Sequence, residues 1–76
     1  MTTVKPTIDK ARLASITRWY ETLIAAKARA RLNGRGYAFA IQWPDGHCTV
    51  EDNKPSLRNQ QMRVIECDCT GGEHFA

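Results

Sequence analysis

The sequence lacks the features of several large protein classes. Its 76 residues contain no apolar run near the ~20 residues that a membrane-spanning helix needs, and residues 1–6 are too short and polar for a secretory signal. We therefore expect a cytoplasmic protein with no membrane partner. At this length we expect one domain, 1–76, with flexible ends at 1–6 and 70–76. A domain this small commonly gains stability from a partner, so a homodimer is possible.

The chain also lacks the motifs on which most catalysis depends. Residues 33–36 are rich in glycine but stand where a helix stops, and so do not form a phosphate-binding loop between a strand and a helix. His47 and His74 lie outside any nucleophile pattern. Cys67 and Cys69 stand in a mostly acidic tail, which does not favour a reactive thiolate. We predict that the protein is not an enzyme and needs no cofactor.

Cysteine is scarce, and its odd count excludes a closed disulfide framework that uses all three residues. The residue types suit zinc, which prefers thiolate and imidazole ligands. The spacing does not, because only a C-x-C pair is present where structural zinc sites usually show C-x2-C. We expect no bound metal and keep a zinc-stabilised adaptor as a second alternative. Its ligand set would be Cys48, Cys67, Cys69 and His74.

Charge is unevenly distributed along the chain. The net charge is +3, but residues 1–35 carry eight basic and two acidic residues, whereas residues 36–76 carry three basic and six acidic residues. Such a chain can offer a basic face to phosphate or to an acidic protein surface.

Residues 7–36 are predicted to form one long amphipathic helix. Thr7 is a plausible N-cap, and Asn33-Gly34 is a stop signal. Apolar residues recur at three- and four-residue steps, as they do on the core-facing side of a helix. The main members of this stripe are Leu13, Ile16, Tyr20 and Leu23.

Basic residues form a ladder on this helix. Arginine at several points along one element is typical of phosphate binding, whereas cations near a helix C-terminus also complement the helix dipole without any ligand. Both interpretations stay open. The candidate binding residues are Arg18, Lys27, Arg29, Arg31 and Arg35, with Trp43 added from the sheet.

The second half of the chain is predicted to be a hairpin and a third strand. Residues 37–43 alternate in the manner of a strand, Pro44-Asp45-Gly46 supplies a turn, residues 47–51 return, and residues 62–67 are rich in β-branched side chains. The fold class is therefore α+β, with the helix packed on a small three-stranded antiparallel sheet in the order αβββ. The residues expected in the shared core are Ile16, Tyr20, Leu23, Tyr37, Phe39, Ile41, Val50 and either Val64 or Ile65.

Residues 35–39, RGYAF, resemble the start of the RNP1 signature of RNA-recognition motifs. The resemblance implies that Tyr37 and Phe39 stack on nucleic-acid bases. Ala40 and Gln42 depart from that signature. The alternative is that both aromatic residues are buried beneath the helix.

These observations favour a small non-catalytic binding or regulatory protein. In size and in its lack of catalytic groups it resembles the accessory proteins of phages. We expect its basic helix to dock on a larger complex that handles nucleic acid, such as a host polymerase or nuclease complex, and to inhibit or modulate it. The alternative is a domain that binds DNA or RNA directly through the helix and the sheet aromatics.

Overall fold

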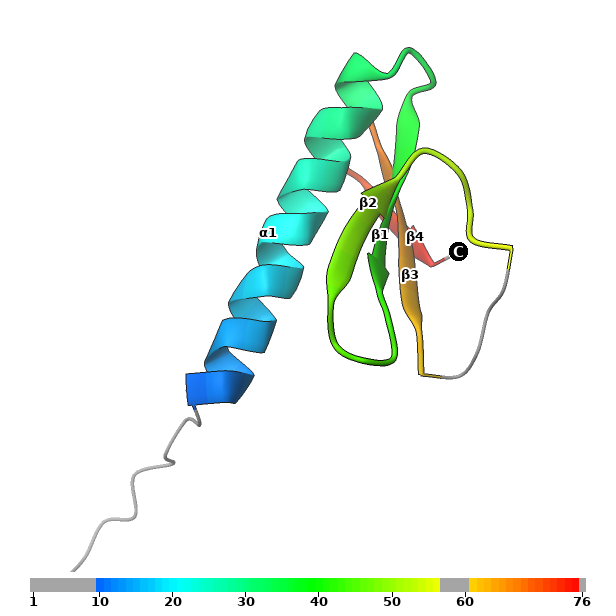
Figure 1. Ribbon diagram of the computed structural model, residues 1–76. Coiled ribbons are helices and arrows are strands. Elements are labelled where there is room, and N and C mark those ends of the chain that lie inside the picture. Colours follow the sequence, from blue (N-terminus) through cyan, green and yellow to red (C-terminus); the bar gives the residue numbers. More distant parts are fainter. Residues whose placement is uncertain (1–9, 57–60, 76) are drawn as a thin grey trace, which may run out of the picture.

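The protein is an α+β domain in which one helix packs on a four-stranded antiparallel sheet (Figure 1). The computed structural model describes residues 10–56 and 61–75, so the expectations for Thr7 and residues 1–6 lie outside the described residues. The elements are α1 (Lys10–Leu32), β1 (Tyr37–Gln42), β2 (Cys48–Glu51), β3 (Arg63–Asp68) and β4 (Glu73–Phe75). The strand order is β2-β1-β3-β4. The predicted fold class is confirmed, with one more strand than expected.

The turns form where the sequence predicted them. The helix ends at Leu32, and the Asn33 amide donates to the Arg29 carbonyl at 2.9 Å before Gly34 takes a positive φ of 74°. Between β1 and β2, the Trp43 amide donates to the His47 carbonyl at 2.9 Å, which closes the predicted hairpin. β1 lies at the centre, between β2 and β3.

The flexibility expected of residues 70–76 stays a prediction, although within them Glu73–Phe75 forms β4 on the edge of the sheet next to β3. The Asp68 carboxylate organises the turn before it. It accepts hydrogen bonds from the Thr70 hydroxyl at 2.6 Å, from His74 Nε2 at 2.8 Å and from the Gly72 amide at 2.8 Å. These bonds, led by that from Thr70, hold the pKa of Asp68 well below its ordinary value.

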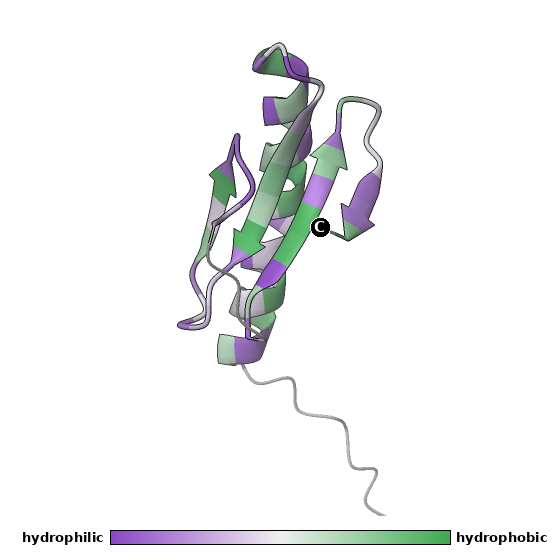
Figure 2. Cartoon of the chain, turned by 90° about the vertical axis from the view of Figure 1, so that its right-hand side faces the viewer, coloured by the Kyte–Doolittle hydropathy of each residue, from purple (hydrophilic) through white to green (hydrophobic). Residues whose placement is uncertain are grey.

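The face of the sheet that packs on the helix is not the one that was predicted. Ala40, Ile65 and Cys67 pack against Ala26 of α1, while Phe39 and Ile41 lie on the far face of the sheet. The prediction that Phe39 and Ile41 face the helix is therefore wrong. Small side chains let the helix and β1 approach closely, whereas the larger residues of β1 form a second cluster with Val64, Met62 and Trp43. The apolar segments of β1 and β3 lie side by side in Figure 2.

The helix is rotated relative to the prediction. Ile16 and Tyr20 were expected in the core but are exposed, whereas Leu23 is partly buried as part of the packed face. The reason is that α1 has two neighbouring apolar faces, and the one that carries Ala26 and Ala30 fits the alanines of β1. The residues on the packed face are Trp19, Thr22, Leu23, Ala26 and Ala30.

Candidate functional site

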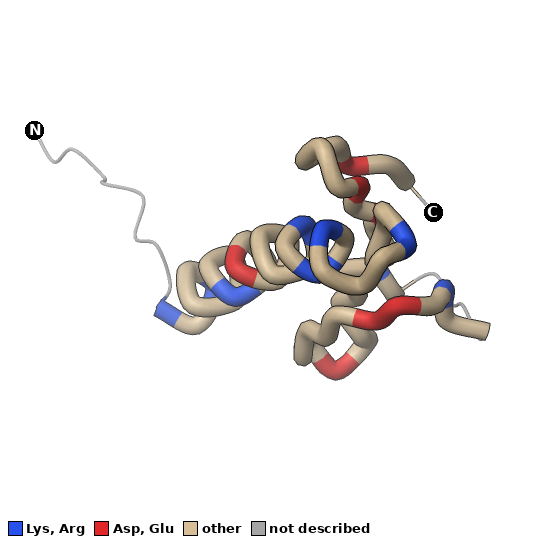
Figure 3. Tube along the Cα trace, turned by 90° about the horizontal axis from the view of Figure 1, so that it is seen from above, with Lys and Arg blue, Asp and Glu red and all other residues tan. Residues whose placement is uncertain are grey.

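The predicted basic ladder is largely occupied by internal partners. Arg29 forms a bidentate ion pair with Asp52, in which Nε donates to Oδ1 and Nη2 donates to Oδ2, both at 2.9 Å. On the other side of the helix, Lys27 Nζ lies 2.6 Å from Glu73 Oε2 on β4. Figure 3 shows acidic segments on both sides of the basic end of α1. These two pairs tie the C-terminal half of the helix to both edges of the sheet.

Two further cations of the ladder also form hydrogen bonds within the domain. Arg31 Nε donates to the Cys69 carbonyl at 3.2 Å. Arg35 Nη1 donates to the Asn53 side-chain oxygen at 2.6 Å. Each exposed contact of this kind contributes little to stability, but together they account for the crowding of cations without any ligand. That Lys27, Arg29, Arg31 and Arg35 bind a partner stays a prediction.

The Asp52 carboxylate is expected to make the stability of the fold depend on pH. Hydrogen bonds from Arg29 and then from Asn33 lower the pKa of its carboxyl group from 3.8 to about 2. Because the folded state has the lower pKa, the ionised contacts stabilise the fold fully above about pH 4, and this stabilisation is lost as the pH falls towards 2. We expect Asp52→Asn to lose less stability than the parent protein across this window in melts at successive pH values. Parallel curves for the two proteins would contradict this role of Asp52.

The N-terminal half of α1 differs from the C-terminal half, because it leans away from the sheet (Figure 1). In the part of the chain that the structure describes, the side chains of Lys10, Arg12 and Arg18 make no hydrogen bond or ion pair. All three are exposed. Of the predicted ladder, therefore, Arg18 is the cation that remains available to an external partner without breaking an internal contact.

Four large apolar side chains lie along one line of α1 and are turned to solvent. Leu13 is 50% exposed, Ile16 56%, Tyr20 66% and Ile24 55%. Their steps of three, four and four residues place them on one face of the helix, here named the exposed stripe. Lys27 continues this line and reaches Glu73 of β4, so the exposed stripe lies on the β4 side of the helix. Leu13, Ile16 and Tyr20 belong to the apolar stripe predicted from the sequence, but the sequence did not reveal that the sheet would leave them uncovered.

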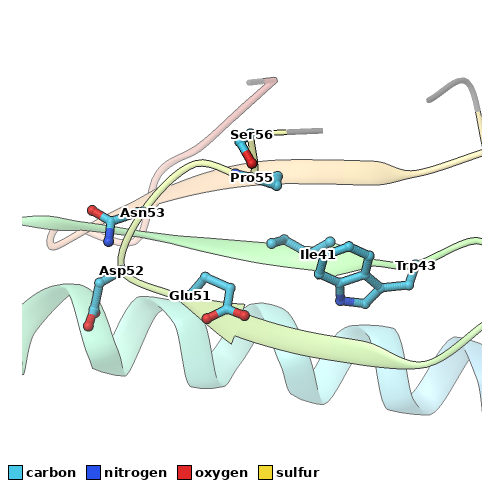
Figure 4. Close-up of a pocket in the computed structure, with 7 residues that line it drawn as sticks. All are labelled: Ile41, Trp43, Glu51, Asp52, Asn53, Pro55 and Ser56. Atoms are coloured by element: carbon cyan, nitrogen blue, oxygen red, sulfur yellow. The ribbon is translucent and has the colours of Figure 1, made fainter. Parts of the chain in front are cut away.

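Trp43, the sixth predicted binding residue, packs with the apolar cluster on the face of the sheet that is turned away from the helix. Its ring stacks on His47 with centroids 5.7 Å apart, and its indole N–H donates to the Thr49 hydroxyl at 2.7 Å. It borders a pocket of about 390 Å³ that has Ile41 and Pro55 among its lining residues (Figure 4). The structure thus does not bring Trp43 together with the basic helix.

The aromatic residues of the RNP1-like segment lie on the face of the sheet that is turned away from the helix. The prediction that both are buried beneath the helix is therefore wrong. Phe39 is nevertheless only 4% exposed, so its ring face is not available to a base. Tyr37 is 37% exposed and meets Phe39 edge to face at 5.7 Å. A stacking surface on β1 is thus reduced to Tyr37.

The four potential zinc ligands are dispersed. Cys48 pairs with Gln42 at one end of β1, while Cys67 pairs with Ala38 near the other end and is buried against the helix. Cys69 follows β3 and is exposed, and His74 is hydrogen-bonded to Asp68. Within residues 10–56 and 61–75, no three His, Cys, Asp or Glu side chains gather as a metal would require. That the protein binds no metal stays a prediction, which metal analysis of the purified protein tests.

Comparison of the chain with protein-family models, with curated proteins and with solved structures gave no match. Among the described residues, no helix is both long and apolar enough to cross a membrane. Of the surfaces that the described residues form, the exposed stripe is the most distinctive.

Proposed function

We propose that the protein is a small non-catalytic binding protein that docks on a partner protein through the exposed stripe of α1. The observation that carries this proposal is that four large apolar side chains, each at least half exposed, lie in one line. Contiguous apolar surface of this kind is typical of a protein interaction site, whereas single exposed apolar residues are not. An apolar helix face that meets a groove or a second helix is a common mode of recognition.

Charge supports a partner that is acidic beside its apolar surface. Arg12 lines a pocket together with Ile16 of the exposed stripe, and Arg18 lines another together with Leu13 and the acidic Glu21. A second copy docked stripe to stripe would bring these cations together at a cost, whereas carboxylates on a different protein would complement them. Nucleic acid suits the stripe less well, because leucine and isoleucine do not recognise phosphate. The expected identity of the partner, a polymerase or nuclease complex whose activity is modulated, stays a prediction.

The double variant Ile16→Ser/Tyr20→Ser is expected to lose the partner while keeping the fold. Burying these two half-exposed side chains contributes roughly 1.5–3 kcal/mol, so affinity should fall about tenfold or more. The measurement is affinity capture from a lysate of the encoding organism, with and without nuclease, followed by titration of the captured protein. The matched control is Leu32→Ser, because Leu32 is 84% exposed but lies off the stripe.

Two outcomes would contradict the proposal. A ligand that disappears after nuclease treatment would favour direct binding of DNA or RNA. A dimer in light scattering that Ile16→Ser/Tyr20→Ser converts to a monomer would show that a second copy covers the stripe. Thermal melts of both variants should stay close to that of the parent protein, since exposed positions rarely change stability by more than about 0.5 kcal/mol.

A further inference from the structure

A second feature adjoins the exposed stripe, where α1 leans away from the end of the sheet (Figure 1). A pocket of about 280 Å³ lies there, between the N-terminal half of the helix and the ends of β1 and β3. We name it the wedge pocket. Ile16 belongs both to this pocket and to the exposed stripe, so the two surfaces are continuous. The residues that line the wedge pocket are Arg12, Ser15, Ile16, Trp19, Gln42 and Arg63.

Two guanidinium groups line the wedge pocket without a counter-ion. The Arg63 guanidinium carbon lies 5.2 Å from the centroid of the Trp19 ring, which holds this side chain over the indole. Arg12 lies in the N-terminal half of α1, well before Lys27 and Arg29, which tie the helix to the sheet. In the described part of the chain, neither the Arg12 nor the Arg63 side chain donates a hydrogen bond or forms an ion pair. Two guanidinium groups from positions far apart in the sequence, neither with an ion-pair partner, therefore line one pocket beside Ile16 and Trp19.

A carboxylate is the group that this arrangement fits. Guanidinium groups bind carboxylates through two parallel hydrogen bonds, and a guanidinium already stacked on an aromatic ring loses little freedom on binding. Phosphate would satisfy the same donors, but a nucleic-acid backbone needs a series of spaced cations, and here one wall is Ile16 and Trp19. The continuity with the exposed stripe points to a ligand that combines apolar side chains with an acid.

We infer that the wedge pocket receives the carboxylate of an aspartate or glutamate side chain from the docked partner protein, between Arg12 and Arg63. This inference rests on the proposed function. It specifies the recognised feature as an acidic residue next to the apolar residues that cover Ile16 and Tyr20. The stripe then supplies apolar contact, while the wedge pocket sets the register of the bound segment.

The test uses a defined probe. Short peptides are selected from a random library on the full-length chain, and the tightest is synthesised with its acidic residue either intact or replaced by the corresponding amide. Binding of both peptides is titrated against the parent protein and Arg63→Gln. We expect Arg63→Gln to weaken the acidic peptide about tenfold and the neutral peptide little, since the pair is coupled. Arg12→Gln should behave in the same way.

Controls separate this inference from the proposed function. Lys54→Gln removes one exposed positive charge that does not line the wedge pocket and should leave both affinities unchanged. Melts of Arg63→Gln and Arg63→Lys check that the fold survives the loss of the contact with Trp19. If Arg63→Gln weakens both peptides equally, or if the selected peptides carry no acid, the wedge inference is wrong while the stripe can still be the docking site.

A failure of the docking proposal would look different. Peptide binding that Ile16→Ser/Tyr20→Ser leaves intact would overturn the proposed function together with the wedge inference. Competition by single-stranded RNA or random duplex, lost in Arg12→Gln and Arg63→Gln and steeply weakened by salt, would show that the two guanidinium groups bind phosphate instead of a partner's carboxylate.

Discussion

Phe39→Ala is expected to lower the free energy of unfolding by about 3–5 kcal/mol, which is a large share of the total stability of so small a domain. Phe39 is almost completely buried on the far face of the sheet, where it packs with Ile41 and Val64. Truncation would remove its apolar contacts and leave a cavity that a sheet cannot readily close. Urea denaturation followed by circular dichroism measures the effect.

Tyr37→Ala is the matched control, because Tyr37 is the neighbouring aromatic residue on the same face of β1 but is 37% exposed. It should cost clearly less than Phe39→Ala. A Phe39→Ala protein that unfolds at the same urea concentration as the parent protein would show that the far face is not a packed cluster. It would also return the ring of Phe39 to the set of surfaces available for stacking on a base.

The elements of the fold could be predicted because their signals are local. The three- and four-residue spacing along α1 and the alternation along β1 each arise within one segment of chain. Pro44-Asp45-Gly46 and Asn33-Gly34 mark turns through conformational preferences of their own residues. In both turns a glycine takes positive φ, 95° at Gly46 and 74° at Gly34. Local chemistry therefore sufficed to predict one helix and three strands.

The pairing of faces could not be predicted in the same way. Both faces of β1 are apolar, with Ala38 and Ala40 on one side and Phe39 and Ile41 on the other, so polarity does not choose between them. What decides is volume, because the small face fits Ala26 of the helix. Sequence periodicity measures apolar character and not fit, which is why it assigned the wrong face.

β4 and the partners of the basic ladder depend on contacts that no local pattern encodes. β4 follows a turn that the side chain of Asp68 organises, and its three residues show no usable periodicity. Lys27 and Glu73 are 46 positions apart, and Arg29 and Asp52 are 23 apart. Charge counting found the basic helix and the acidic second half, but only the fold shows that much of one neutralises the other. The exposed stripe could likewise be recognised only in the fold, because no local pattern shows which face of the helix the sheet covers.

Ala26→Leu is expected to lower the free energy of unfolding by about 1–3 kcal/mol, although leucine is nearly as good a helix former as alanine. Ala26 is completely buried and shares a cluster with Ala40 and Ile65. A larger side chain there would push α1 away from β1 or force its neighbours from their preferred rotamers. Chemical denaturation measures the loss, and the ring resonances of Trp19 report whether the helix has shifted over Arg63.

Ala25→Leu is the matched control, because Ala25 precedes Ala26 in the same helix but is exposed. The two substitutions change helix propensity and composition identically, so a difference between them isolates the contact with the sheet. Ala25→Leu should be close to neutral. Equal stability of the two variants would mean that the helix does not pack on β1 through its alanine face. The rotation of α1 that exposes Leu13, Ile16, Tyr20 and Ile24 would then be wrong as well, and the proposed docking surface with it.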